Sequence, residues 1–176
     1  MRWYNHVLGG TLAELIITSG TGPVFNNTLA AGISALVPDI DSPYSKLGHN
    51  LPVLSHGTSL VLGHRGPIHS LLAGFLYAIL VSNFFPDLVV PAMVGFISHL
   101  ILDALSGGVN PLWPLKFSVS IPLFSTMGFR ELFIATPALM AANAWAVWNF
   151  IGVQEAGVII INGVFNMIRQ VISNIA

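Results

Sequence analysis

The chain contains no cysteine, which excludes disulfide bonds and thiolate metal ligands, so any metal must be held by imidazole and carboxylate groups. Charged residues are also scarce, at 7% of the 176 residues, whereas an average soluble domain has about 25%. The net charge of −1 excludes the strongly basic surface of a nucleic-acid-binding protein. The HExxH motif of zinc proteases, internal repeats and low-complexity segments are likewise absent.

Hydrophobic residues make up 54% of the chain and give it a mean hydropathy of +0.78. The segments 70–86 and 132–151 carry no charged residue. Because a helix needs roughly 20 apolar residues to cross about 30 Å of hydrocarbon, this composition predicts an integral membrane protein. We do not expect the first segment to be a signal peptide, because its basic start is Arg2 alone and Glu14 interrupts the apolar run.

Proline, glycine and polar clusters divide the chain into six expected helices, with two long loops at 39–66 and 106–129. The helices are expected at about 6–19, 26–37, 67–85, 88–105, 130–150 and 154–172. The first two are short for a full crossing. We therefore predict an all-α, polytopic membrane helix bundle that forms a single domain over residues 1–176, with no second domain.

The basic residues predict the orientation of this bundle. Alternating the helices through the bilayer puts the N-terminus and both long loops on one side, together with Arg2, Lys46, Arg65, Lys116, Arg130 and Arg169. The opposite turns carry only Asp87 and Glu155. By the positive-inside rule we predict a multi-pass protein of the inner (cytoplasmic) membrane with both termini cytoplasmic. Trp113, Trp145 and Trp148 are expected to anchor helix ends at the interface.

Seven candidate metal ligands fall near the ends of these apolar segments, on the predicted cytoplasmic side: His6, Asp39, Asp41, His64, His69, His99 and Asp103. His99 and Asp103 are four residues apart, so they share one helix face, one turn apart. An isolated HxxxD pair in a soluble helix is usually inert. Inside an apolar segment, however, a partnerless imidazole or carboxylate costs several kcal/mol, which favours a metal site.

His64 and His69 precede the third expected helix, and a tight turn joins that helix to the fourth. The start of the third helix and the end of the fourth must therefore be neighbours, which places both histidines near His99 and Asp103. Pro67 suits a first helical position, where free amides stabilise negative charge. The alternative is that His69 caps the helix and His64 is solvated.

Asp39 and Asp41 would share a face and a cation if their segment were extended, whereas in a turn they would cap local amides. His6 reaches the same side from the first helix. Glu14, two turns deeper, is either a general base or supporting group, or a protonated acid bonded within the bundle. Arg65 suits bidentate binding of a substrate phosphate, or an ion pair with one of the two aspartates.

These motifs resemble the YdjM family over residues 6 to about 122. The resemblance rests on His6, VPDIDSP at 37–43, GHRGPIHS at 63–70, HLILD at 99–103 and GVNPLWP at 108–114. That family is described as inner-membrane metal-dependent hydrolases with a LexA-related label. The resemblance implies a bacterial or archaeal membrane enzyme whose divalent metal is bound by these histidines and aspartates. The HxxxD pair is also similar to zinc-dependent phospholipases C, which implies phosphoester cleavage.

The resulting hypothesis is a metal-dependent hydrolase that cleaves a phosphoester or ester of a lipid-like substrate with metal-activated water. Arg65, Asp41 and Glu14 are its candidate catalytic residues. We expect one or two divalent ions, with zinc favoured over manganese or iron. Seven candidate ligands exceed the three that a single catalytic zinc typically uses, which favours a dinuclear or larger cluster.

The expected partners are the lipid bilayer and an amphipathic or lipid phosphate substrate, without nucleic acid. The LexA-related label and the loop at 39–66 add a cytoplasmic protein partner, and the oligomeric state stays open. The alternative function is a metal-binding transport or partner-binding membrane protein without hydrolytic activity, because histidine and aspartate in membrane helices also mark ion pathways.

Overall fold

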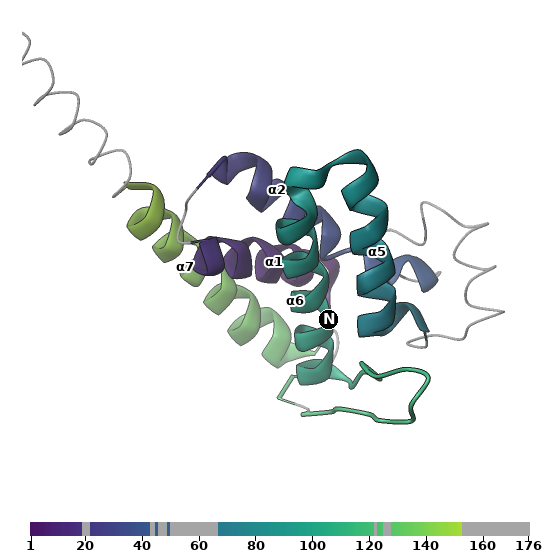
Figure 1. Cartoon of the computed structure of the whole chain (residues 1–176). Helices are drawn as coiled ribbons and strands as arrows, with labels where there is room; N and C mark the ends of the chain where they lie inside the picture. Colours follow the sequence, from purple (N-terminus) through teal and green to yellow (C-terminus); the bar gives the residue numbers. More distant parts are fainter. Residues whose placement is uncertain are drawn as a thin grey trace, which may run out of the picture.

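The structure is a computed structural model that describes residues 1–18, 22–42, 45, 49, 67–121, 123–124 and 128–152 (Figure 1). Five α-helices lie in this part of the chain: α1 (Trp3–Thr18), α2 (Val24–Ser34), α5 (Leu71–Phe84), α6 (Val89–Ser106) and α7 (Thr136–Ala146). These residues form no β-strand beyond one isolated bridge between Val109 and Val119. The all-α prediction is confirmed for them, and the sixth expected helix, at 154–172, lies outside the described residues.

Short 3-10 and π segments extend the α-helices. Three are 3-10 turns, η1 (Val37–Asp41), η2 (Pro67–His69) and η3 (Pro86–Leu88), and two are π-helical turns that flank α7, η4 (Glu131–Ala135) and η5 (Val147–Ile151). The third helix does not begin at Pro67 as predicted. Pro67 starts η2, and α5 begins only after Ser70, whose Oγ accepts a hydrogen bond from the Ala73 N–H at 3.2 Å.

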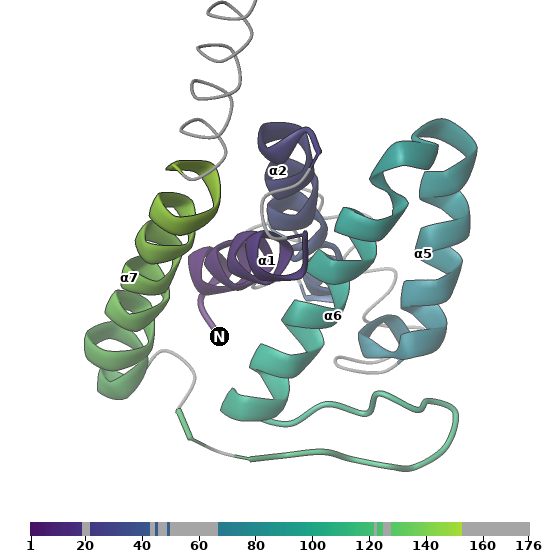
Figure 2. The ribbon, with the colours of Figure 1, turned by 60° about the vertical axis from the view of Figure 1, so that its left-hand side comes forward.

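The centre of the molecule is the meeting point of α1, α2 and α6. Helix α1 crosses α6 steeply, α5 runs beside α6, and α7 covers the side of α1 away from α5 (Figures 1 and 2). A Cβ atom at Gly95 would lie 2.0 Å from the Ala31 carbonyl oxygen, and one at Gly10 would lie 2.7 Å from the same atom. Glycine at both positions therefore lets the end of α2 lie against α1 and α6 at once.

Among the described residues, one helical stretch, Pro86–Ser106, is long and apolar enough to cross a membrane: it has 21 residues, and an 18-residue window within it has a mean hydropathy of 2.0. Helices α1, α2 and α5 have 16, 11 and 14 residues, and at about 1.5 Å per residue they are shorter than a hydrocarbon layer of about 30 Å. The expected shortness of the first two helices is confirmed. The described helices do not provide six full membrane crossings, and the multi-pass topology stays a prediction.

Candidate metal centre

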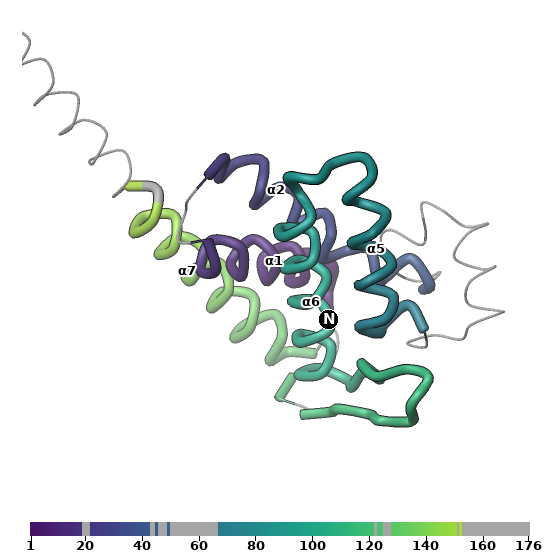
Figure 3. Tube along the Cα trace, viewed as in Figure 1, coloured from purple at the N-terminus to yellow at the C-terminus, as the bar shows by residue number. Residues whose placement is uncertain are grey.

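Six of the seven predicted ligands lie in the described part of the chain, and the fold brings them together. His6 comes from α1, Asp39 and Asp41 from η1, His69 from η2, and His99 and Asp103 from α6. The tube in Figure 3 shows how these four segments converge from distant parts of the sequence. All are buried except Asp39, which is partly exposed. His64 and Arg65 lie outside the described residues.

Three ligand atoms form a compact triangle near the N-terminal end of α5, which follows η2. His69 Nε2 lies 3.3 Å from His99 Nε2, and Asp103 Oδ2 lies 3.6 Å from each of these nitrogens. Two ligands that each lie about 2.05 Å from a zinc ion at the tetrahedral angle are about 3.3 Å apart. The triangle therefore has the size of a three-ligand zinc site, and its donor set of two imidazoles and a carboxylate fits such an ion.

The tautomers of His69 and His99 follow from the hydrogen bonds of the ring nitrogens that point away from the triangle. His99 Nδ1 donates to the Ala35 carbonyl at 2.7 Å, and His69 Nδ1 donates to Asp41 Oδ2 at 3.2 Å. Each Nδ1 therefore holds the ring proton, and each Nε2 presents a lone pair. Two lone pairs and a carboxylate oxygen then face one another in a buried space. A cation bound between them would remove the repulsion among these three acceptors.

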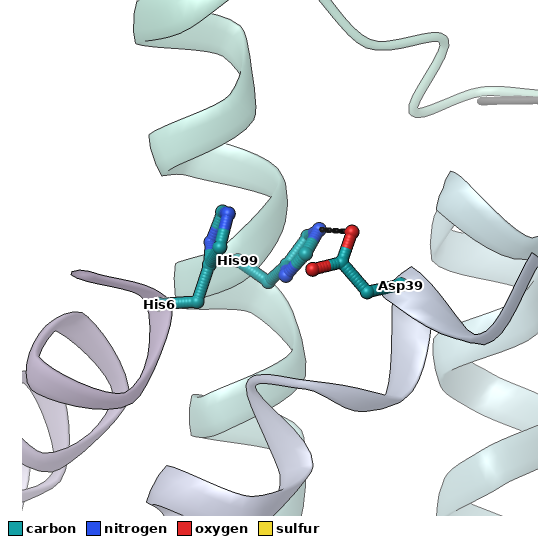
Figure 4. Close-up of side chains that lie close together, drawn as sticks. All are labelled: His6, Asp39 and His99. Carbon is teal, nitrogen blue, oxygen red and sulfur yellow. Dashed lines mark ion pairs between the residues drawn. The ribbon is translucent and has the colours of Figure 1, made fainter. Parts of the chain in front are cut away.

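A second group of candidate ligands overlaps the first (Figure 4). The His6 and His99 rings stack with centroids 3.9 Å apart, and Asp39 Oδ1 lies 4.0 Å from His99 Nε2. Neither nitrogen of the buried His6 has a hydrogen-bond partner among the described residues, and its Nε2 lies 3.6 Å from Asp103 Oδ1. Because both groups use the same His99 nitrogen, they compete for one ligand atom.

Asp39 and Asp41 do not share a face, because of the two alternatives for their segment the extended one is wrong. Residues 37–41 form a 3-10 helix with about three residues per turn, so side chains two positions apart diverge. Asp39 points to His99, whereas Asp41 contacts the outer nitrogen of His69. Burial raises the pKa of Asp39. Asp41 therefore lies behind a ligand and orients it, as carboxylates behind metal-bound histidines do.

The main-chain amino group of Met1 is a further partner of Asp103. It lies 3.1 Å from Asp103 Oδ1 and 3.5 Å from the hydroxyl of Ser106. The two carboxylate oxygens thus have different surroundings: Oδ1 faces the ammonium group and His6, and Oδ2 faces His69 and His99.

Glu131 is a buried carboxylate that sequence reasoning missed. Its Oε1 accepts hydrogen bonds from the Arg2 backbone N–H and from Asn5 Nδ2, the latter at 2.9 Å. Thr136 Oγ1 donates to Asn5 Oδ1 at 3.0 Å, so η4 and α7 hold the start of α1 next to His6. The sequence signal that could have found it is an acidic residue at the start of the predicted fifth apolar helix, because a buried carboxylate there is costly without polar partners.

Glu14 is fully buried in α1 but belongs to neither ligand group among the described residues. The alternative role of His69 as a helix cap is wrong, because Ser70 caps α5. The six described ligands therefore serve one buried cluster, and Glu14 lies apart from it along α1.

Comparisons with known proteins agree with a membrane location. A family model described as YdjM inner membrane protein matches residues 1–170. The uncharacterized protein YvsG of Bacillus subtilis is 35% identical over 148 residues, which cover 81% of this chain and 92% of that protein. The inner membrane protein YdjM of Escherichia coli is 33% identical over 146 residues, 77% of this chain and 72% of that protein. No solved structure matches.

Proposed function

This chain belongs to the YdjM family of inner membrane proteins, and on that premise we propose that it is a metal-dependent hydrolase of the membrane. The observation that carries the proposal is the buried triangle of His69 Nε2, His99 Nε2 and Asp103 Oδ2. Its outer hydrogen bonds leave both nitrogens ready to bind a cation, and burial without one would leave three acceptors facing one another. We favour zinc because of the triangle's edge lengths.

A single ion fits the ligands better than the expected dinuclear cluster. The outer nitrogen of His99 is engaged by the Ala35 carbonyl, so His99 has one nitrogen to offer, and each ligand group requires it. His6 and Asp39 then border the ion as a fourth ligand or as groups that hold a proton beside it. A bound divalent ion supplies an activated water and stabilises developing negative charge.

The surroundings of the site favour a substrate with a hydrocarbon part. His99 and Asp103 lie in the last turns of α6, near the end of the stretch that is long enough to span a membrane. A groove of about 310 Å³ is lined by Met1, whose amino group contacts Asp103, and by apolar side chains of α6 and α7 such as Leu102, Leu105 and Leu139. We propose a phosphoester or ester of a lipid-like molecule, with Arg65 as a candidate for its phosphate group.

The second candidate function is transport or partner binding without hydrolysis. An ion pathway needs ionisable groups along the membrane, and in α6 those groups are His99 and Asp103, both in its final two turns. Helix α5 has no Asp, Glu, His, Lys or Arg along Leu71–Phe84. This distribution favours a site at one membrane face over a pathway, and a cytoplasmic protein partner stays a prediction.

The first experiment measures metal content by mass spectrometry in detergent-purified protein that has never met a chelator. We expect about one equivalent in the wild type and its loss in His99→Ala and Asp103→Asn. Asp87→Asn, in the turn η3 that precedes the opposite end of α6, changes an exposed residue; it is the matched control and should keep the metal. The same samples are then assayed on phospholipids and isoprenoid phosphates.

Absence of metal from folded wild-type protein would overturn the proposal, and two equivalents would restore the dinuclear hypothesis. One equivalent with no hydrolysis across the lipid panel would favour the transport or partner-binding alternative. Hydrolysis that is lost in the two ligand variants and kept in Asp87→Asn would support the hydrolase.

A further inference from the structure

Residues 107–121, which follow α6, form a hairpin with a fixed base. Val109 and Val119 exchange two backbone hydrogen bonds of 2.9 Å each. The base is also tied to both neighbouring helices, because the Leu71 N–H donates to the Pro111 carbonyl at 2.8 Å and the Ile121 N–H donates to the Ala104 carbonyl at 2.8 Å. Val109 is buried against Phe96 and Leu100 of α6. We call this segment the 107–121 hairpin.

The outer part of the 107–121 hairpin is apolar and exposed. Residues 112–118 are all exposed, and four of these seven are large apolar side chains: Leu112, Trp113, Leu115 and Phe117. Leu115 is 66% exposed and Phe117 is 52% exposed, so neither packs into the bundle. A cluster of exposed large apolar side chains on a hairpin with a fixed base marks a surface that meets another apolar phase or a partner.

The position of the 107–121 hairpin indicates whether its exposed apolar side chains meet a membrane or a protein partner. The span-length stretch ends at Ser106, so the hairpin begins where that stretch leaves the hydrocarbon. In Figures 1 and 2 the hairpin runs outward across the ends of α6 and α5 and does not continue along the axis of α6. A segment with this direction lies along the membrane surface if α6 crosses the membrane.

The composition of the hairpin matches a membrane surface rather than a protein partner. Tryptophan prefers the headgroup region, and Trp113 lies at the outer part of the hairpin. Lys116, the one charged residue in the 107–121 sequence, is exposed between Leu115 and Phe117. In a lysine flanked by apolar residues, the ammonium group can contact anionic phosphates while the neighbouring side chains contact the hydrocarbon beneath them.

We propose that the 107–121 hairpin is an interfacial anchor that binds anionic phospholipid headgroups. Leu115 and Phe117 insert between the headgroups, and Lys116 contacts their phosphates. This anchor would hold the metal-ligand cluster at the level of the headgroups, because the hairpin and Asp103 lie at the same end of α6. The proposal does not depend on metal binding or on hydrolysis.

The absence of cysteine makes a direct test possible in the full chain. Phe117→Cys is labelled with an environment-sensitive fluorophore, and the protein is reconstituted into vesicles of phosphatidylcholine and phosphatidylglycerol. Quenching is compared between a lipid with a nitroxide near its headgroup, a lipid with a nitroxide deep in its chain, and aqueous iodide. Leu76→Cys, on the exposed apolar surface of α5, is the matched control for a deep position. Leu115→Cys provides a second hairpin position.

We expect both hairpin labels to be quenched most by the shallow nitroxide, and the Leu76 label most by the deep one. Lys116→Gln should lower the ratio of lipid to iodide quenching about fivefold in vesicles that contain phosphatidylglycerol, and should have no effect in phosphatidylcholine alone. Quenching of the hairpin labels by iodide alone would overturn the proposal. Protection from all three quenchers would also overturn it, because the hairpin would then be covered by protein. An unchanged ratio in Lys116→Gln would overturn the headgroup contact.

Discussion

Replacing Gly95 with alanine tests whether the close approach of α2 to α6 positions the metal-ligand cluster. The new methyl group would lie 2.0 Å from the Ala31 carbonyl oxygen and 2.8 Å and 2.9 Å from the adjacent carbon atoms. All three are backbone atoms, so no side-chain rotation can relieve the contact. Helix α2 must move away by about 1.4 Å to reach the 3.4 Å of an ordinary contact.

This movement has two consequences. Overpacking of this kind typically costs about 1–3 kcal/mol, which for a chain of this size lowers the melting temperature by roughly 2–12 °C. Ala35 lies one helical turn after Ala31, and its carbonyl accepts the 2.7 Å hydrogen bond from His99 Nδ1. If this hydrogen bond is lost, we expect metal affinity to fall by about 10–100-fold, as when partners behind metal-bound histidines are removed.

The assay combines thermal unfolding, followed by tryptophan fluorescence, with titration of Co²⁺ followed by its visible absorption. Gly152→Ala is the matched control, because a Cβ atom there has no neighbour within 4 Å among the described residues and alanine favours the helix. A wild-type melting temperature in Gly95→Ala would show that the fold does not need the close approach of α2 to α6 at this position. If this variant is destabilised but binds Co²⁺ with unchanged affinity, the link between α2 and His99 is refuted.

Three further predictions concern the cluster and its support. Asp41→Asn should lower Co²⁺ affinity about 10–100-fold while leaving the melting temperature of metal-free protein nearly unchanged, since the amide still accepts from His69. Metal affinity should fall on acidification, because protons compete with the metal for the imidazole lone pairs; pH-independent Co²⁺ titrations would contradict imidazole ligation. Glu131→Ala should destabilise the protein by about 1–3 kcal/mol, because it removes the acceptor of the hydrogen bonds from Asn5 Nδ2 and the Arg2 N–H. Glu131→Gln keeps an acceptor and should restore most of this stability in thermal unfolding; equal stability of both variants would contradict the role of Glu131 Oε1 as an acceptor.

The helix pattern was predictable because apolar runs between turn residues are long in this sequence. The fourth helix was expected at 88–105, and α6 spans Val89–Ser106. The fifth was expected at 130–150, which η4, α7 and η5 cover together. The structural start of the third helix differs, since Pro67 forms a 3-10 turn and the capping hydroxyl of Ser70 delays the α-helix.

The meeting of His69 with His99 and Asp103 was also predictable, and the reason is topological. A short turn, η3, joins α5 to α6, so the beginning of one helix must return beside the end of the other. Spacing alone then brings a histidine before α5 next to an i, i+4 pair late in α6. No comparable rule indicated that Asn5 and Thr136 would surround Glu131, because that contact depends on how α7 packs against α1.

The division of roles within the cluster was not predictable from residue types. Asp39 and Asp41 have the same side chain, and only the 3-10 turn of η1 sends one toward His99 and the other behind His69. The partner that fixes His99 is the carbonyl of Ala35, 64 residues earlier, and every residue carries a carbonyl. What distinguishes Ala35 is that Gly10 and Gly95 admit the preceding turn of α2 between α1 and α6. The sequence signal for this oriented histidine therefore lies in two glycines that are not themselves ligands.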